Sequence, residues 1–177
     1  FDYISITPPH LSCPDRILCA KQVFVDLKNY SYVNEKKLQQ ISFDAFQVSS
    51  IDSLLNIKNF SFSPTIEENE FLDHLRHRKT FFSMTSRELK SNTFDFYELY
   101  NSHKVLAKKI VIESPELMIA ENLKKARVEG KIPTMPNTLV KEMPFYMNIN
   151  QLEVHKADIV YNERAKKGSG TGTVYFT

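Results

Sequence analysis

Glycine is scarce in this chain: only four of the 177 residues are glycine, and three of them lie close together at positions 168–172. This scarcity excludes a glycine fingerprint for dinucleotides and a Walker-type phosphate loop anywhere before Gly168, because both motifs need several glycines at fixed spacing. Residues 168–172 follow Lys166 and Lys167 and could contact a phosphate, but no helical pattern comes after them. A hairpin loop is therefore the better interpretation of this segment.

Long apolar runs and an excess of charge are also missing. No stretch approaches the ~18 apolar residues that a membrane-spanning helix needs. The 23 basic residues are nearly balanced by 21 acidic ones, so binding of nucleic acid through phosphate neutralisation is not indicated. At 42% hydrophobic and 25% charged residues, the composition is that of a globular chain with one domain or at most two.

Only two cysteines are present, Cys13 and Cys19. Two free thiols are the simpler interpretation, and a local disulfide that would bring the Cα atoms within about 7 Å is the alternative. A zinc site is disfavoured because no further cysteine or suitably spaced histidine follows. The chain starts at Phe1 without methionine and stops inside the apolar alternation of residues 174–177, so we expect it to be a segment of a longer polypeptide.

Alternation of apolar and polar residues dominates what is present. Residues 3–6 and 17–27 are rich in β-forming residues, and residues 41–48 and 55–62 alternate with a period of two. The second of these alternations shifts phase near Asn59. The pattern predicts strands with one buried face.

Residues 66–79 differ, and their pattern predicts a helix. Thr65 could cap it, acidic residues follow in the first turn and basic residues come near the end, which suits the helix dipole. Phe71, Leu72 and Leu75 supply an apolar stripe at helical spacing.

Residues 84–100 are ambiguous. Residues 94–100 could form a helical turn with Phe94, Tyr97 and Leu99 facing the sheet. We therefore predict a helical interruption over residues 65–100.

The most informative feature is an internal match between residues 110–121 and 152–163, at an offset of 42 and without a gap. Each copy holds two short pairs of apolar residues. The last residue of the first pair and the first residue of the second pair are five positions apart, as from Ile112 to Leu117 and from Val154 to Ile159. A weaker copy occurs over residues 55–62. The apolar members of the two full copies are Ile110, Ile112, Leu117, Ile119, Leu152, Val154, Ile159 and Tyr161.

The separation of five has a structural consequence. Within a regular strand, an odd separation turns the second apolar pair to the opposite face. We therefore predict a bulge or corner at residues 114–115 and 156–157, which brings both apolar pairs onto the same face of the sheet. A chance similarity between strands is the alternative to a true repeat.

These patterns together predict a fold that is mainly β with one or two short helices (α+β). We expect an antiparallel, twisted, repetitive sheet that can curl into an open groove. Strands would occupy residues 1–64, the helical interruption residues 65–100, and two copies of a roughly 42-residue strand-pair unit residues 108–177. Such a quasi-one-dimensional array buries its face by stacking neighbouring units.

The reactive side chains form no catalytic pattern. No serine lies in a Gly-x-Ser-x-Gly context. Glu70, His74 and His77 would share one face of the predicted helix and could hold zinc, but basic side chains crowd the same turns, so a solvated helix face is the better interpretation. We expect neither an enzyme, nor a cofactor, nor a metal site.

Five segments of the C-terminal part carry a family resemblance. They are the run IVIESPELMIA at 110–120, the proline-bearing link at 132–139, the strand entry at 143–152, the strand end at 157–163 and the final GTVYF at 172–176. This order resembles the large AsmA-like (TamB-related) envelope proteins of Gram-negative bacteria. The upstream residues fit more loosely, and the membrane anchor usual in that family is not in this sequence.

The resemblance implies a long, twisted sheet curled into a groove whose apolar face conducts phospholipid acyl chains between membranes, without catalysis. It implies a periplasmic protein, anchored to a membrane through parts outside this sequence, with phospholipid or fatty acyl chains and envelope proteins as partners. The eight apolar repeat residues would line the groove, or equally form an ordinary core under the helix at 66–79. A β-scaffold that binds a partner through exposed sheet edges is the second hypothesis.

Overall fold

The computed structural model describes residues 17, 20–34, 38–74, 76–126, 146–168 and 170–177. Some of the expected features lie outside the described residues. They are the strand at residues 3–6, the pairing of Cys13 and Cys19, the proline-bearing link at 132–139, and residues 143–145 of the strand entry at 143–152.

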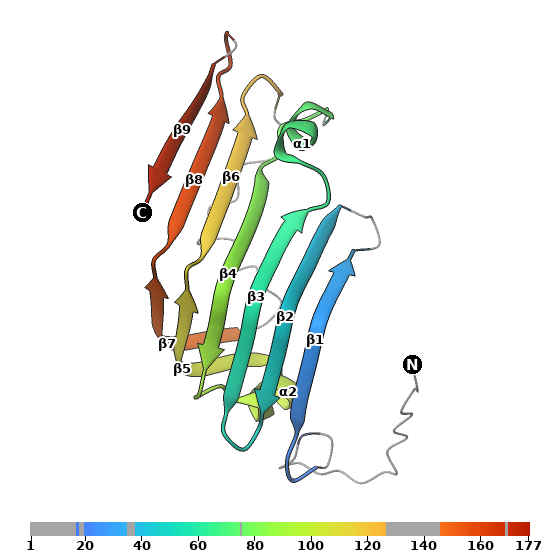
Figure 1. Ribbon diagram of the computed structural model, residues 1–177, viewed down its shortest axis with the longest axis vertical. Coiled ribbons are helices and arrows are strands. Elements are labelled where there is room, and N and C mark those ends of the chain that lie inside the picture. Colours follow the sequence, from blue (N-terminus) through green and yellow to red (C-terminus); the bar gives the residue numbers. More distant parts are fainter. Residues whose placement is uncertain (1–16, 18–19, 35–37, 75, 127–145, 169) are drawn as a thin grey trace.

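Within the described residues the chain forms two short helices and a sheet of nine strands that is not closed into a barrel (Figure 1). The expectation of a mainly β fold is thus confirmed. The elements are β1 (Phe24–Val33), β2 (Gln39–Ser49), β3 (Leu54–Pro64), α1 (Glu68–His74), β4 (Phe81–Ser91), α2 (Phe96–Ser102), β5 (Lys104–Glu113), β6 (Glu116–Asn122), β7 (Tyr146–His155), β8 (Asp158–Arg164) and β9 (Thr171–Phe176).

The sheet is mostly antiparallel, but two of its pairings are parallel. β1 to β4 pair in sequence order, and β4 then pairs with the end of β5 and with β6. β5 lies parallel to β7 and β6 parallel to β8, and β9 returns antiparallel along β8. An alternating strand pattern is the same for both directions, so the sequence did not reveal the parallel pairs, which need a long crossover connection.

The offset of 42 in the internal match is the register of these parallel pairs. Ile110 pairs with Leu152, and Leu117 pairs with Ile159. Residues that match in sequence therefore lie side by side in the sheet, and equivalent side chains of the two copies become neighbours on one face.

Strand register aligns the side chains into rows that cross the sheet and alternate between apolar and polar. The lower apolar row, in the orientation of Figure 1, consists of Leu27, Phe46, Ile57, Leu89, Ile112 and Val154. The upper apolar row consists of Tyr32, Ile41, Phe62, Met84, Leu117, Ile159 and Phe176. The row beside it, on the opposite face, is polar and consists of Ser31, Ser42, Ser61, Thr85, Glu116 and Asp158.

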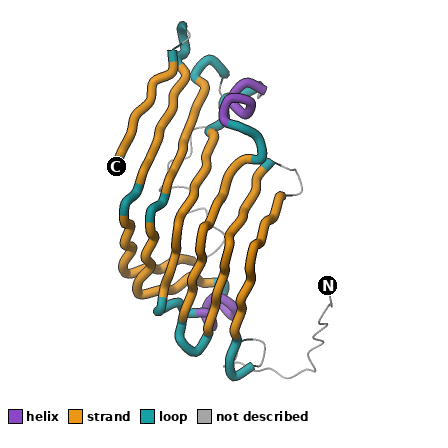
Figure 2. Tube along the Cα trace, viewed as in Figure 1, coloured by secondary structure: helices purple, strands orange, loops and turns teal. Residues whose placement is uncertain are grey.

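A line of left-handed backbone, which we call the crease, lies between the two apolar rows. Asn29, Asn59, Ser114 and Lys156 have φ values of 51, 50, 48 and 54°. The registers place these four residues at one height, on the strands that run in the same direction. Figure 2 shows the crease as two short breaks at equal height, between β5 and β6 and between β7 and β8.

The crease keeps the two apolar rows on the same face, although five residues separate them along each strand. The rings of Phe43 and Phe46, on either side of the crease in β2, are 5.6 Å apart. The corners expected at residues 114–115 and 156–157 are confirmed by the positive φ of Ser114 and Lys156.

Below the crease the apolar face is covered. The first parts of β5 and β7 run across behind the sheet, together with α2 (Figure 1). The closed core that results is built on four buried residues and their partly buried neighbours: Leu55, Phe94, Ala107 and Ile110, with Phe46, Val48, Ile57, Leu89, Phe96, Val105, Ile112 and Ile149 around them.

The helix expected at 66–79 is shorter than predicted, because α1 covers only Glu68–His74. Beyond it, the backbone N–H of Arg78 donates to the carbonyl oxygen of Ala126 at 2.9 Å, which draws the chain out of the helix. Leu72, which is 2% exposed, packs with Phe81 and Ala120. These two strand residues face away from the apolar rows, so α1 covers the opposite face of the sheet.

The ambiguous segment 84–100 contains most of β4 and the start of α2. Asp95 caps α2 by accepting a hydrogen bond from the backbone N–H of Glu98 at 2.9 Å. Phe94 is buried as expected, but Leu99 is 39% exposed, and Phe96 packs on the closed core in its place. The core therefore lies under β5 and α2 rather than under the first helix.

Candidate functional site

Above the crease the apolar side chains form a face that we call the open apolar face. They belong to six described strands plus β9 at the edge, and include the upper apolar row. The members are Tyr30, Tyr32, Ile41, Phe43, Phe62, Phe82, Met84, Leu117, Ile119, Ile159, Tyr161, Val174 and Phe176.

None of these side chains is buried, which separates this face from the closed core. At the two ends of the upper apolar row, Tyr32 is 47% and Phe176 57% exposed. Residues in the middle of the row, such as Met84, are half-buried. Among the described residues neither helix lies over this face, because α1 packs on the opposite face and α2 packs below the crease.

Aromatic rings give the open apolar face a flat, continuous surface. Tyr30 and Phe43 stack at 5.1 Å, and Phe62 and Phe82 lie 6.0 Å apart. The Tyr161 hydroxyl donates to Glu163 at 3.0 Å, and partial burial raises the pKa of this phenol. The polar atom that Tyr161 brings to the face therefore has a partner within the protein.

The structure divides the eight residues that the sequence proposed for a lipid groove. Leu117, Ile119, Ile159 and Tyr161 lie on the open apolar face. Ile110 and Ile112 belong to the closed core, so they do not line an open surface. Leu152 and Val154, on β7, are 56% and 45% exposed and lie below the crease.

Sequence reasoning missed the part of the face contributed by β1, β2 and β4. The signal was nevertheless there: the separation of five recurs from Leu27 to Tyr32 and, in the reverse direction, from Phe46 to Ile41 and from Leu89 to Met84. On β2 and β4, which run in the opposite direction, the apolar residues follow each other along the chain in the reverse order. A search for direct sequence repeats therefore does not find them.

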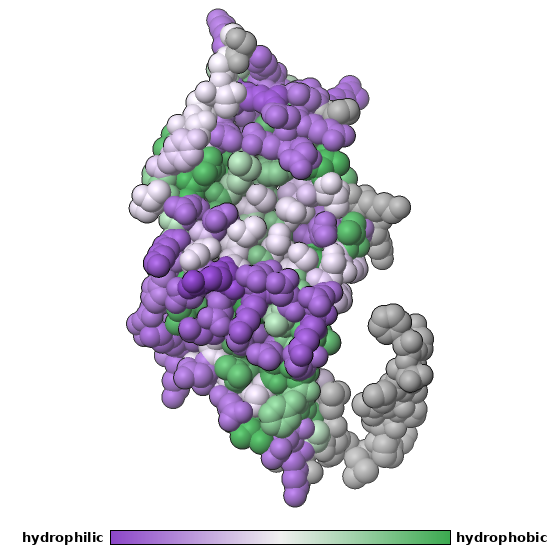
Figure 3. All heavy atoms as spheres, in the orientation of Figure 1, coloured by the Kyte–Doolittle hydropathy of each residue, from purple (hydrophilic) through white to green (hydrophobic). Residues whose placement is uncertain are grey.

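The opposite face of the sheet is mainly hydrophilic across its middle, as Figure 3 shows. Near the crease, Glu113 accepts a hydrogen bond from His155 at 2.9 Å, and this bond lowers the pKa of the Glu113 carboxyl. Lys109 pairs with Glu153 at 2.7 Å and likewise lowers the pKa of Glu153. All of these side chains are at least partly solvated, so they favour a water-facing surface without adding much stability.

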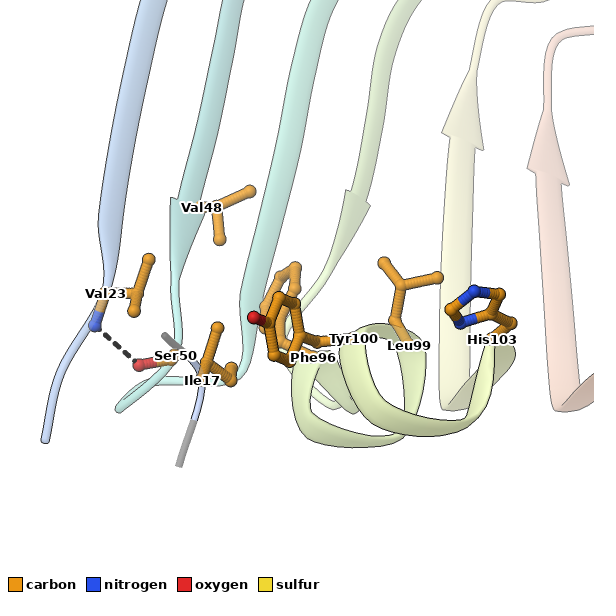
Figure 4. Close-up of a pocket in the computed structure, with 8 residues that line it drawn as sticks. All are labelled: Ile17, Val23, Val48, Ser50, Phe96, Leu99, Tyr100 and His103. Carbon is orange, nitrogen blue, oxygen red and sulfur yellow. Dashed lines mark hydrogen bonds between the residues drawn. The ribbon is translucent and has the colours of Figure 1, made fainter. Parts of the chain in front are cut away.

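A cavity of about 470 Å³ lies at the lower end of the sheet, between α2, the start of β1 and the end of β2 (Figure 4). Its walls are almost wholly apolar, and Leu99 and Tyr100 from α2 face Val23 and Val48 across it. Ser50 lies at its edge, where its hydroxyl oxygen accepts the backbone N–H of Val23 at 2.9 Å.

A second cavity, of about 420 Å³, lies at the crease and has a mixed polar lining that includes Asn59, Arg87 and Glu116. Among the described residues, no three histidine, cysteine or acidic side chains come together as metal ligands would. The described helices are also too short to cross a membrane. The binding surfaces that the described residues do offer are the open apolar face and the apolar cavity beside α2.

Comparison of the chain with protein-family models, with curated proteins and with solved structures found no match.

Proposed function

We propose that the open apolar face binds acyl chains, and that the chain is a non-catalytic segment of an AsmA-like, bridge-type protein of the bacterial envelope. In this proposal it works in phospholipid transfer or outer-membrane homeostasis, in the periplasm, held to a membrane by parts outside this sequence. The observation that carries the proposal is the upper apolar row, seven apolar side chains on seven adjacent strands with none of them buried.

Single exposed apolar residues are common on protein surfaces, but a contiguous exposed apolar face is not. Large exposed apolar patches on soluble proteins mark binding sites, and aggregation is the cost of leaving them uncovered. An acyl chain that lies on this face transfers methylene groups out of water, at roughly 0.8 kcal/mol for each one buried. The backbone N–H and C=O groups inside the sheet are paired between neighbouring strands, which suits a ligand without polar groups along its length.

The two faces of the sheet support the same assignment. The polar row through Ser42, Ser61 and Thr85 lies one residue along each strand from the upper apolar row. One face can therefore contact lipid while the other stays in water. The resemblance to AsmA-like proteins, carried by residues 110–120 and 157–163, agrees with this division.

The decisive experiment compares two lysine variants on one strand. Met84→Lys places a charge in the middle of the open apolar face, and Thr85→Lys places the same charge on the polar face one residue away. We expect a fluorescent fatty acid to bind wild type and Thr85→Lys saturably, and Met84→Lys at least tenfold more weakly. Native mass spectrometry of wild type should show copurified lipid.

Two outcomes would contradict the proposal, one for the wild type and one for the pair of variants. If wild type neither copurifies with lipid nor binds the fluorescent fatty acid saturably, the face does not bind acyl chains. If both lysine variants weaken binding equally, the ligand lies elsewhere. Circular dichroism of each variant separates lost binding from lost folding.

A second candidate function is a β-scaffold that binds a protein partner through its sheet edges. Among the described strands, β1 has a partner on one side only, and so does β7. An unpaired edge is a template for another strand. Sedimentation velocity of delipidated protein over a hundredfold range of concentration discriminates the two functions: a stable monomer favours lipid binding, and concentration-dependent oligomers favour strand addition.

A further inference from the structure

The apolar surface of β1 and β2 continues across the crease into the lower half of the molecule. On β1 it runs from Tyr32 through Leu27 to Val25, and the paired positions on β2 are Ile41, Phe46 and Val48. Leu27 is 44% exposed, so β5 and α2 leave the β1 side of this surface uncovered, while Phe46 and Val48 on β2 also pack against the closed core. We call this surface the apolar lane.

The cavity beneath α2 lies at the lower end of the apolar lane. Val48 belongs to both, and Val23 continues β1 into the cavity wall. At about 470 Å³, the cavity falls within the range of ordinary small-ligand sites. Figure 4 shows that Phe96, Leu99 and Tyr100 close the side opposite the strands.

We infer that this cavity holds the methyl end of a single acyl chain, whose remaining length follows the apolar lane toward the crease. The inference deepens the proposed function and rests on it. Among the described residues that line the cavity there is no lysine or arginine to receive a carboxylate or a phosphate, and His103 lies at the end of the cavity away from Val23 and Val48 (Figure 4). The Ser50 hydroxyl oxygen already accepts a backbone N–H. The polar head is therefore the end that stays outside.

The lengths are compatible. A strand rises about 3.3 Å per residue, so the lane from Val23 to Tyr32 measures about 30 Å. The hydrocarbon core of a bilayer is also about 30 Å thick and holds two acyl chains end to end, so one chain spans about half of it. A chain that ends in the cavity would thus cover about the lower half of the lane, to about Leu27, with its polar head directed toward the crease at Asn29.

Photo-labelling with two forms of palmitic acid tests the orientation on the whole chain. One form carries a diazirine at the methyl end and the other carries it next to the carboxyl group. We expect the methyl-end label to be found at least fivefold more on the peptide that contains Leu99 and Tyr100 than on peptides from β3. The carboxyl-end label should instead be found more on the β1 and β2 peptides that contain Leu27 and Phe46 than on the α2 peptide.

A tryptophan variant fills the cavity. Leu99→Trp should reduce methyl-end labelling of the α2 peptide at least fivefold, whereas Asn101→Trp, on an exposed position of the same helix, should leave it unchanged. The inference is overturned if the methyl-end label favours β3 peptides, or if Leu99→Trp and Asn101→Trp behave alike. If neither form labels the protein saturably, the proposed function itself fails.

Discussion

Below the crease, the apolar row that contains Ile57 and Ile112 lies under β5 and α2, whereas above it the row that contains Phe62 and Leu117 has no described element over it. Both rows run across the same strands on the same face. The difference teaches that an alternating strand pattern specifies which face is apolar, but not what covers that face. Stability should therefore concentrate in the closed core, and binding on the apolar surface that lies outside it.

The largest expected effect is on the closed core. Ile110 is 8% exposed, and truncation of a buried isoleucine to alanine costs about 2–5 kcal/mol. We predict that Ile110→Ala lowers the free energy of unfolding by about 3 kcal/mol, measured by urea denaturation. A loss below about 1 kcal/mol would mean that the lower half is not the more tightly packed one.

The next effect concerns the crease that joins the halves. A β-branched residue tolerates the left-handed region poorly, so Ser114→Val, at a φ of 48°, should cost about 1–2 kcal/mol. Ser114→Gly is the matched control, because glycine adopts positive φ without strain, and it should not destabilise the protein. Equal unfolding midpoints for the two variants would show that the crease does not depend on left-handed backbone.

A smaller effect on stability is expected from the open apolar face. Leu117 is only half-buried, so Leu117→Ala should lower the free energy of unfolding by about 1 kcal/mol, clearly less than Ile110→Ala. The same change should weaken fatty acid binding severalfold, while Ile110→Ala, if folded, should not. Titration of the fluorescent fatty acid with both variants would show whether packing and binding are separated in this way.

The smallest effect concerns pH. The hydrogen bond from His155 lowers the pKa of Glu113 below its ordinary value of 4.5. A carboxyl whose pKa is lower in the folded state stabilises the protein above the unfolded-state pKa, and this contribution is lost as pH falls through the folded-state pKa. Urea midpoints should therefore drop slightly below pH 4.5, and Glu113→Gln should flatten that part of the pH profile. An identical slope in wild type and variant would assign the pH dependence to other groups.

Much of the strand arrangement could be predicted from local patterns. The alternation in β2 and β3, and the corners at Ser114 and Lys156, follow from the spacing of apolar residues alone. The offset of 42 even gave the register of two strand pairs, because matching residues lie side by side. Their parallel direction was not predicted, since it depends on the path of the intervening chain and not on the pattern of either strand.

Other features depend on contacts between distant residues. Strand β4 was missed because its small polar residues, such as Ser86 and Ser91, are buried and donate hydrogen bonds to carbonyl oxygens of β5. Helix α1 ends at His74, and beyond it the backbone N–H and the guanidinium of Arg78 donate to carbonyl oxygens of residues 123–126, which no local pattern indicates. The division of the eight candidate site residues between core and open face likewise depends on where β5 and α2 come to lie.

The crease has one more consequence, for the fidelity of folding. In a uniform sheet, a strand that slips by two residues keeps its apolar side chains on the correct face, so hydrophobic burial alone cannot reject the error. Here such a slip would misalign the left-handed residues, or would require Ile57, Ile112 or Val154, two positions before them, to take positive φ. β-branched side chains resist that conformation. The row of left-handed residues thus disfavours a two-residue register slip in every strand that carries one.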